Sequence, residues 1–367
     1  MKLTLVNLLR CPNCGSKLTC IPYKVINEAE VLDGVLKCQC GDAHIVYQGV
    51  PKMVTSSSLP EGFIRNYRDR LLQDAPVLAS AETTTSDTFS FSYQWSTHAY
   101  DDLTWELYLP ERIEIFYRYF NMTPEQAGGV RLLDAGCGNG TLSAQLAAEG
   151  FEVVGMDYSE SVYRAYQYKL FESQVTNAVF DRLHFVQGDV QHPPFEQGLF
   201  DLVYSDGVLH HTPDTKSSFM ALAPVVKPGG RLLVWLYRRD TKPRVTAKNS
   251  LVKLVRRSTS NLSYQNKMRV CYTGAALLLL GVRVGQLFGY KKRRLIPLRL
   301  KATNLFDTIS PQFNHEHTPD EVASWFREAG YTDIKDVSLS EYRLDEGGFA
   351  MIGTRGKLGD SKEEAVF

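Results

Sequence analysis

A glycine-rich turn behind a predicted buried strand constrains this chain more than any other stretch of its sequence. Val130 to Ala135 is largely apolar without alternation, as a parallel strand covered on both faces should be. Glycines then alternate with other residues up to Gly140, and a helix is predicted to begin at Thr141. Glycine allows the dihedral angles of such a turn and a close approach of a ligand to the backbone. A ligand there also meets the N-terminus of the next helix, so the stretch predicts a nucleotide-binding α/β fold.

Further strand signals follow in an order that suits this fold. Strands are predicted at residues 151–157, 183–189, 200–206 and 231–237. The first of these ends in Asp157, about 20 residues after the turn, where an acid can bind ribose hydroxyls. The second ends in Gly188 and Asp189. Because ligands bind at the carboxyl ends of parallel strands, these residues are predicted to line one site.

Together these motifs resemble those of the class I S-adenosylmethionine-dependent methyltransferases, over roughly residues 90–356. The resemblance implies an α/β fold with a Rossmann-like seven-stranded sheet that binds S-adenosyl-L-methionine. It assigns to the cofactor Asp134, Gly136, Cys137, Gly138, Gly140, Asp157, Tyr158, Gly188, Asp189, Val190 and Ser205. An NAD-type dinucleotide fold is the alternative, but its fingerprint needs a glycine at position 141, which is a threonine.

Aromatic residues gather at 89–95, just before this core. In related methyltransferases a similar stretch folds over the cofactor, so the resemblance implies that Tyr93 bonds the methionine carboxylate. The alternative is that these aromatic rings only pack a helix against the sheet.

Two histidines, His210 and His211, follow the fourth predicted strand. A histidine titrates near neutral pH and can accept a proton from an attacking oxygen or nitrogen. We predict that one of them is a catalytic base, with His211 slightly favoured because it lies further into the loop, while the other braces the loop. The motifs of amino-methylating and cytosine-C5 enzymes, Asn/Asp-Pro-Pro-Tyr and Pro-Cys, are absent from the sequence at this point.

Four cysteines occur near the N-terminus in two close pairs, Cys11 with Cys14 and Cys38 with Cys40. Two such pairs predict a structural four-thiolate zinc site. The stretch resembles the zinc-ribbon domain of small activator proteins of tRNA and rRNA methyltransferases, over about residues 1–55. The second pair departs from the usual Cys-x-x-Cys spacing, so Cys20 or His44 could replace one ligand.

The segment 238–301 is strongly basic, although the whole chain has 41 basic and 41 acidic residues. It holds 17 Lys/Arg and a single acid, Asp240. Its position predicts a helical insertion over the acceptor, suited to a hydrophobic or anionic molecule or to an anionic membrane surface. A solvated helical cap and RNA binding are the alternatives. The apolar run from Cys271 to Gly289 is interrupted by Arg283 and is not expected to span a bilayer.

We therefore expect a methyltransferase that acts on a small, hydrophobic or anionic acceptor, with oxygen favoured over carbon. An RNA methyltransferase and a non-catalytic cofactor-binding subunit are the alternatives. The short opening run before the first cysteine predicts no secretion signal, and the cysteine pattern favours a cytoplasmic location, with peripheral membrane binding left open. The sequence gives no indication of the oligomeric state.

The expected organisation comprises six segments. They are a zinc ribbon (1–55), a linker with a helical and aromatic cap (56–125), the cofactor-binding core (126–237), the basic and apolar insertion (238–312), a C-terminal helix and hairpin that complete the core (313–356), and a tail (357–367). Helices are predicted at 61–79, 110–121, 141–149, 160–173 and 318–329, the first with Ile64, Tyr67, Leu71 and Leu72 on one face.

Overall fold

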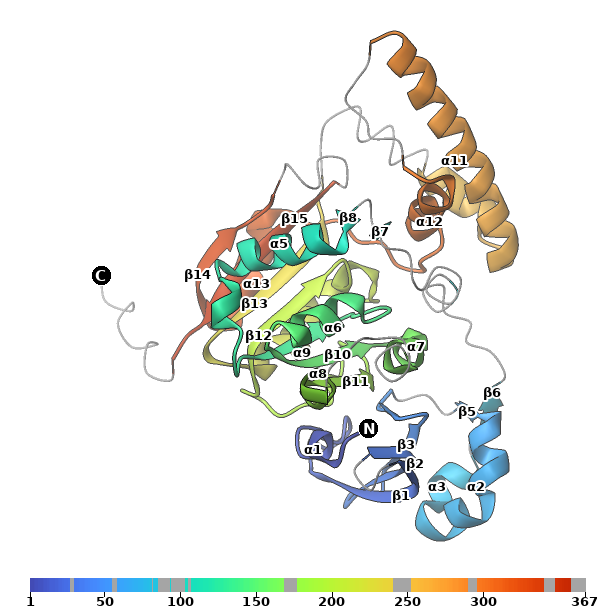
Figure 1. Cartoon of the computed structure of the whole chain (residues 1–367), viewed down its shortest axis with the longest axis vertical. Helices are drawn as coiled ribbons and strands as arrows, with labels where there is room; N and C mark the ends of the chain where they lie inside the picture. The colour runs from blue at the N-terminus through green and yellow to red at the C-terminus, as the bar shows by residue number, and fades with distance from the viewer. Residues whose placement is uncertain are drawn as a thin grey trace.

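The computed structural model describes residues 1–26, 30–54, 58–80, 82–84, 93, 103–104, 107–167, 177–239, 252–289, 296–339 and 347–357. One eleven-stranded sheet runs through most of the described chain (Figure 1). Seven of its strands form the core: β9 (Arg131–Ala135), β10 (Glu152–Asp157), β11 (Leu183–Gln187), β12 (Phe200–Asp206), β13 (Val226–Tyr237), β14 (Tyr331–Asp336) and β15 (Gly348–Arg355). They lie in the order β11-β10-β9-β12-β13-β15-β14, which confirms the predicted Rossmann-like sheet.

The core strands are parallel from β11 to β13, and β15 pairs antiparallel with both β13 and β14. The Lys-Pro-Gly-Gly stretch at residues 227–230 lies inside β13, which begins at Val226, five residues before the predicted start. An irregularity in the β12–β13 register accommodates it, with Gly229 at a φ of +81°.

Helices cover both faces of the core sheet. One face carries α5 (Leu109–Phe120), α6 (Thr141–Ala148), α7 (Ser161–Gln167) and α8 (Asn177–Arg182), and the other carries α9 (Thr215–Leu222) and α13 (Pro319–Glu328). Aromatic rings fill the interface between α5 and the sheet. The centroid of the Phe116 ring lies 5.6 Å from that of Phe151 and 5.5 Å from that of Tyr204. The predicted helix at 160–173 is described only as α7, because its second half lies outside the described residues.

The N-terminal strands continue this same sheet. They are β1 (Leu18–Ile26), β2 (Glu30–Cys38), β3 (Ala43–Tyr47) and β4 (Val50–Lys52), preceded by the short helix α1 (Leu3–Val6). β4 lies parallel to β11 through Lys52 and Gln187, and the Met53 N–H donates to the Gln187 carbonyl at 2.7 Å. The N-terminal unit therefore forms one edge of the nucleotide-binding sheet, whereas the sequence suggested only a separate segment.

Helices α2 (Glu61–Asp74) and α3 (Pro76–Ala79) pack on this N-terminal unit. Phe63 and Leu71 are buried against Val35 and Ile45. The prediction that Leu72 shares this apolar face is wrong, because its side chain is 56% exposed. Short elements complete the described chain: β5 (Ser58–Pro60), β6 (Glu82–Thr84), β7 (Leu103–Thr104), β8 (Leu107–Tyr108) and the 3₁₀ turns η1 (Pro124–Gln126), η3 (Leu209–His211) and η4 (Ala223–Val225).

The insertion after β13 contains two long helices, α11 (Tyr264–Leu287) and α12 (Leu298–Ile309), which pack against each other (Figure 1). By length and composition α11 is the one described helix that could cross a membrane. Arg283 lies inside this helix and does not end it, and the expectation that the run does not span a bilayer stays a prediction. Tyr93 contacts this insertion, with its ring 5.6 Å from Phe306 and 5.8 Å from Tyr264.

Candidate functional site

The glycine turn folds back onto the second core strand. The N–H groups of Gly136 and Cys137 both donate to the Met156 carbonyl, at 2.7 and 3.0 Å. Gly136 has a φ of +101°, and a Cβ on it would lie 2.1 Å from Val208 Cγ2. Gly140 has a φ of +73°, and a Cβ there would lie 2.7 Å from the Ala165 methyl group. Both positions therefore require glycine for conformation and for space.

Asp157 ties the turn to the end of β10. Its Oδ2 accepts the Gly138 N–H at 2.9 Å, and its Oδ1 accepts the Ser159 N–H and hydroxyl at 2.8 and 2.7 Å. The carboxylate is thus fixed beside the turn at the carboxyl edge of the sheet. Tyr158 follows Asp157 in the chain, and its side chain is 48% exposed. Its ring is therefore accessible to a flat ligand.

Asp134 lies behind the turn in the interior. Its Oδ2 accepts the Ser143 hydroxyl at 2.6 Å. Burial raises the pKa of Asp134 to about 6, an effect that Ser143 and Arg112 partly oppose. Sequence reasoning missed Ser143, Arg112 and the buried Asn139, whose Oδ1 accepts the Thr141 N–H at 3.3 Å. In the sequence, Asn139 is a polar residue among the glycines, and Ser143 and Arg112 are polar residues on the flanking helices α6 and α5.

The third and fourth strands end beside this turn. The Gly188 N–H donates to the Asp157 carbonyl at 3.0 Å, and Asp189 follows with its Oδ1 accepting the Gln191 N–H at 2.8 Å. Ser205 has no exposed surface, and its hydroxyl donates to the Ala135 carbonyl at 3.1 Å. Cys137 and Val190 are also buried.

The two predicted histidines occupy different environments. His210 has no exposed surface, and neither ring nitrogen has a hydrogen-bond partner. Its ring lies 4.0 Å from that of Tyr237 and 4.2 Å from that of His211. His211 is half-buried, and its Nδ1 lies 3.0 Å from the Phe313 carbonyl, so Nδ1 carries the hydrogen and Nε2 is the basic nitrogen of the neutral ring.

Burial shifts the titration of both histidines. It lowers the pKa of His210 well below its ordinary value, and it lowers the pKa of His211 to about 4 although the Phe313 carbonyl opposes the shift. Both rings are therefore neutral at physiological pH. Since only His211 has accessible surface, it is the one of the two that an acceptor molecule could reach.

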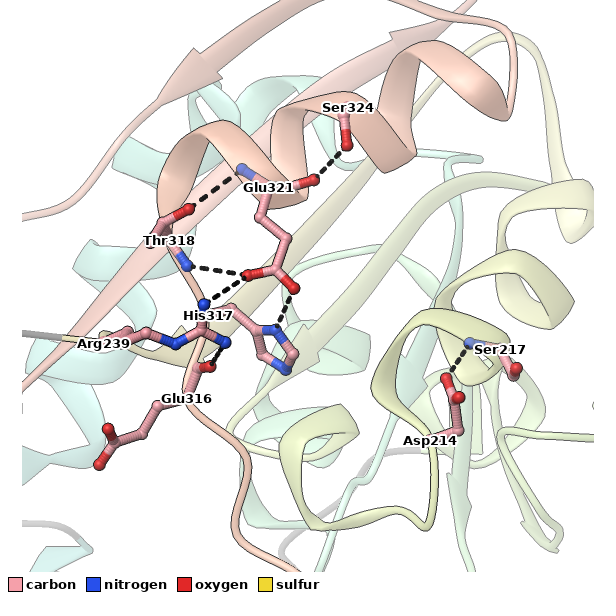
Figure 2. A network of polar contacts seen from close by, with 8 residues as sticks. All are labelled: Asp214, Ser217, Arg239, Glu316, His317, Thr318, Glu321 and Ser324. Atoms are coloured by element: carbon pink, nitrogen blue, oxygen red, sulfur yellow. Dashed lines mark hydrogen bonds and ion pairs between the residues drawn. The ribbon is translucent and has the colours of Figure 1, made fainter.

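A network of polar contacts holds residues 316–321, which follow Phe313 in the chain (Figure 2). Glu321 at the start of α13 accepts the Thr318 N–H at 3.4 Å and contacts His317 Nδ1 at 3.2 Å. Arg239, just past β13, donates to the Glu316 carbonyl at 2.7 Å. Thr318 and Glu321 form a capping box at the start of α13. The network thus ties the start of α13 to the end of β13.

The four N-terminal cysteines converge. Their sulfur atoms all lie within 4.8 Å of one another, with 3.3 Å between Cys14 and Cys38 and 3.9 Å between Cys11 and Cys40. Four sulfurs about 2.3 Å from a tetrahedral zinc ion would lie about 3.8 Å apart, so the donor set fits this ion despite the shortened second pair. Cys20 joins no such group among the described residues, whereas His44 forms a second group with Cys11 and Asp42.

The strand order, the glycine turn and the acids at the strand ends define a Rossmann-like domain of the methyltransferase class. Residues 133–234 match the model of the family described as methyltransferase domain. Residues 133–234 of this chain are therefore a methyltransferase domain.

Two curated relatives are similar to part of this chain. A ubiquinone biosynthesis O-methyltransferase of Pectobacterium atrosepticum is 32% identical over 148 residues, which cover 39% of this chain and 59% of that protein. A demethylmenaquinone methyltransferase of Clavibacter sepedonicus is 33% identical over 148 residues, covering 38% and 58%. The chain thus spans less than two thirds of the length of these relatives.

Among solved structures, the magnesium protoporphyrin IX methyltransferase of Synechocystis PCC 6803 with bound SAH is 16% identical, with a TM-score of 0.38. The superposition covers 81% of this chain and 100% of that chain.

Proposed function

We propose that the protein transfers the methyl group of S-adenosyl-L-methionine to a small hydrophobic or anionic acceptor, with oxygen as the favoured acceptor atom and carbon next. The observation that carries this proposal is the carboxylate of Asp157, fixed by Gly138 and Ser159 at the carboxyl edge of a methyltransferase domain. The names of the two relatives, an O-methyltransferase and a demethylmenaquinone methyltransferase, support a quinone-like acceptor.

The residues present fit this cofactor. Asp157 would accept hydrogen bonds from the ribose hydroxyls, with Tyr158 and Asp189 on the adenine side. The backbone of the glycine turn, with Asp134 behind it, would face the methionine portion. When bound, the cofactor supplies a methyl group on a positively charged sulfur. A contact between Tyr93 and the methionine carboxylate stays a prediction.

His211 is proposed to accept the acceptor's proton. The O–H bond of the acceptor breaks, the proton moves to Nε2, and the oxygen keeps the electron pair with which it attacks. The contact of Nδ1 with the Phe313 carbonyl orients the ring for this step, and its low pKa keeps the ring neutral. His210 is proposed to pack beneath it, because no part of its side chain is exposed.

Calorimetry with S-adenosyl-L-methionine tests the cofactor proposal. Asp157→Ala should weaken binding at least tenfold, because a hydrogen-bonded carboxylate at the ribose is lost. The matched control is Glu152→Ala, since Glu152 lies at the opposite end of the same strand in an exposed ion pair with Arg131. Equal affinity of both variants and the wild type would refute the assignment of Asp157.

Turnover tests the acceptor. Transfer of a labelled methyl group should occur to phenolic, quinol-type molecules in lipid extracts, with an O-methyl or C-methyl product told apart by NMR. Labelling of RNA instead, with strongly salt-dependent RNA binding, would support the alternative of an RNA methyltransferase. Cofactor binding without turnover on any extract would support a non-catalytic subunit.

We also propose that Cys11, Cys14, Cys38 and Cys40 bind a structural zinc ion. The converging sulfur atoms support this proposal. Metal analysis of the purified protein should find one zinc per chain, and Cys14→Ser should lower the zinc content, whereas Cys20→Ser should not. Retention of zinc by the Cys14 variant would point to the group formed by Cys11, Asp42 and His44.

A further inference from the structure

Helix α11 presents an exposed row of apolar side chains, here called the apolar stripe. Its members and their exposed fractions are Val270 (42%), Leu277 (67%), Leu280 (59%), Val284 (44%) and Leu287 (84%). Spacings of seven, three, four and three residues place them on one side of the helix. The stripe extends over 17 residue steps, or about 25 Å at 1.5 Å per residue.

The opposite side of α11 is already occupied. Met268, Cys271 and Ala275 are buried there against α12, together with Phe306. The apolar stripe is therefore not the side of α11 that packs inside the insertion. Figure 1 shows α11 extending away from the core sheet. An apolar surface of this length is unusual on a soluble protein and indicates an interaction site.

The surroundings of the stripe are positively charged. Over the described residues 252–289 and 296–309 the chain has one acid, Asp307, and eight basic residues. The basic residues are Lys253, Arg256, Arg257, Lys267, Arg269, Arg283, Arg299 and Lys301. Arg269 and Arg283 are exposed and lie on α11 itself.

We propose that the apolar stripe docks the protein on the surface of an anionic bilayer, with α11 lying in the plane of the interface. Apolar side chains would enter the boundary of the acyl chains, and the flanking basic residues would contact anionic headgroups. A helix that keeps one side packed against α12 lies on the bilayer and does not cross it.

Charge favours a bilayer over a second copy of the chain. The stripe's spacing also suits a two-helix coiled coil. A twofold pairing of α11, however, would bring together two segments that each carry eight basic residues and one acid, and their repulsion opposes it. An anionic surface is complementary to the same charges.

The C-terminal end of the insertion leads into the segment that contacts His211. Arg256 donates to the Pro311 carbonyl at 2.6 Å and to the Thr308 carbonyl at 3.1 Å, just before the segment that holds His211 through Phe313. Docking would therefore bring the proposed acceptor side near the bilayer, where hydrophobic molecules partition. Only this consequence rests on the proposed function, because docking itself needs neither cofactor nor acceptor.

Vesicle sedimentation of the full chain tests the proposal. The wild type should bind vesicles that contain about one third phosphatidylglycerol, more weakly at high salt, and should bind pure phosphatidylcholine vesicles at least tenfold less. The double variant Leu280→Glu/Leu287→Glu should lose at least tenfold in binding. The control Leu72→Glu/Val77→Glu changes a leucine and a valine on α2 and α3 that are 56% and 55% exposed, and it should bind like the wild type.

Three results would overturn the proposal. The first is equal binding to both kinds of vesicle, and the second is unchanged binding of the stripe variant. The third is that the wild type does not bind vesicles and instead forms a dimer in light scattering, which the stripe variant does not form. Resistance of the bound protein to alkaline carbonate would show a spanning helix and would also contradict surface docking. Cofactor calorimetry on the stripe variant keeps this test separate, since its affinity should equal that of the wild type.

Discussion

Replacing Asp134 by asparagine should stabilise the protein at neutral pH, by an amount that grows with pH. Burial raises the pKa of Asp134 from its ordinary 3.8 to about 6. The folded state thus binds the proton more tightly than the unfolded chain, so the stability that the protonated acid contributes below pH 4 is lost as pH rises through 6. At about 1.4 kcal/mol per pH unit, the whole loss is about 3 kcal/mol. Asparagine does not titrate, and its carbonyl can still accept the Ser143 hydroxyl.

The assay is urea unfolding of the wild type and Asp134→Asn, followed by tryptophan fluorescence at pH 5 and pH 7.5. About half of the loss, roughly 1.4 kcal/mol, falls between these two values, so the variant's advantage should widen by that amount. An advantage that stays constant or shrinks with rising pH would refute the assignment of a buried, proton-retaining carboxyl. The affinity of Asp134→Asn for the cofactor, measured on the same samples, should be lower than that of the wild type, because the acid serves the site at the expense of stability.

Four further predictions follow from the site. His211→Gln should lower kcat about 10²-fold with little change in cofactor affinity, and wild-type activity should show no loss from this histidine as pH falls from 8 to 5, since its pKa is about 4. Gly136→Ala should destabilise the fold by about 3 kcal/mol in urea unfolding, because its methyl group would meet Val208 in a left-handed backbone conformation. Removing the proposed zinc ion with a chelator, or Cys14→Ser, should unfold the N-terminal strands in circular dichroism and weaken cofactor binding several-fold in calorimetry, since β4 pairs with β11. Glu321→Ala should cost about 1 kcal/mol through the lost cap and lower kcat several-fold, as measured by unfolding and turnover.

Controls separate these effects from general damage. Gly128→Ala should leave stability nearly unchanged, because a Cβ there meets nothing within 4 Å. A loss of cofactor affinity in His211→Gln equal to its loss of kcat would indicate a structural role. Full cofactor affinity of the metal-free protein would show that the N-terminal unit and the cofactor site are independent. An unchanged kcat in Glu321→Ala would show that the polar network does not position His211.

The sequence located the core and its glycine turn because their signals are local. A strand buried on both faces reads as an apolar run, and a turn that needs left-handed dihedral angles reads as glycine, so both can be recognised without a partner. The acids at the strand ends followed from the same logic, since strand ends in a parallel sheet share one edge. Ser143 and Arg112 could not be found in this way, because their importance comes from contacts between separate elements.

Tertiary structure alone decided how the segments combine. The sequence by itself determined the glycine turn, the four cysteines and the basic charge of the insertion, because each depends on residue types at short spacing. Packing decided that the N-terminal strands extend the core sheet through β4 and β11, that His210 is buried while His211 is half-buried, and that α11 leaves the apolar stripe exposed. Burial depends on what lies opposite a residue in space, and a pattern of apolar residues is the same whether its partner is a protein core or a bilayer.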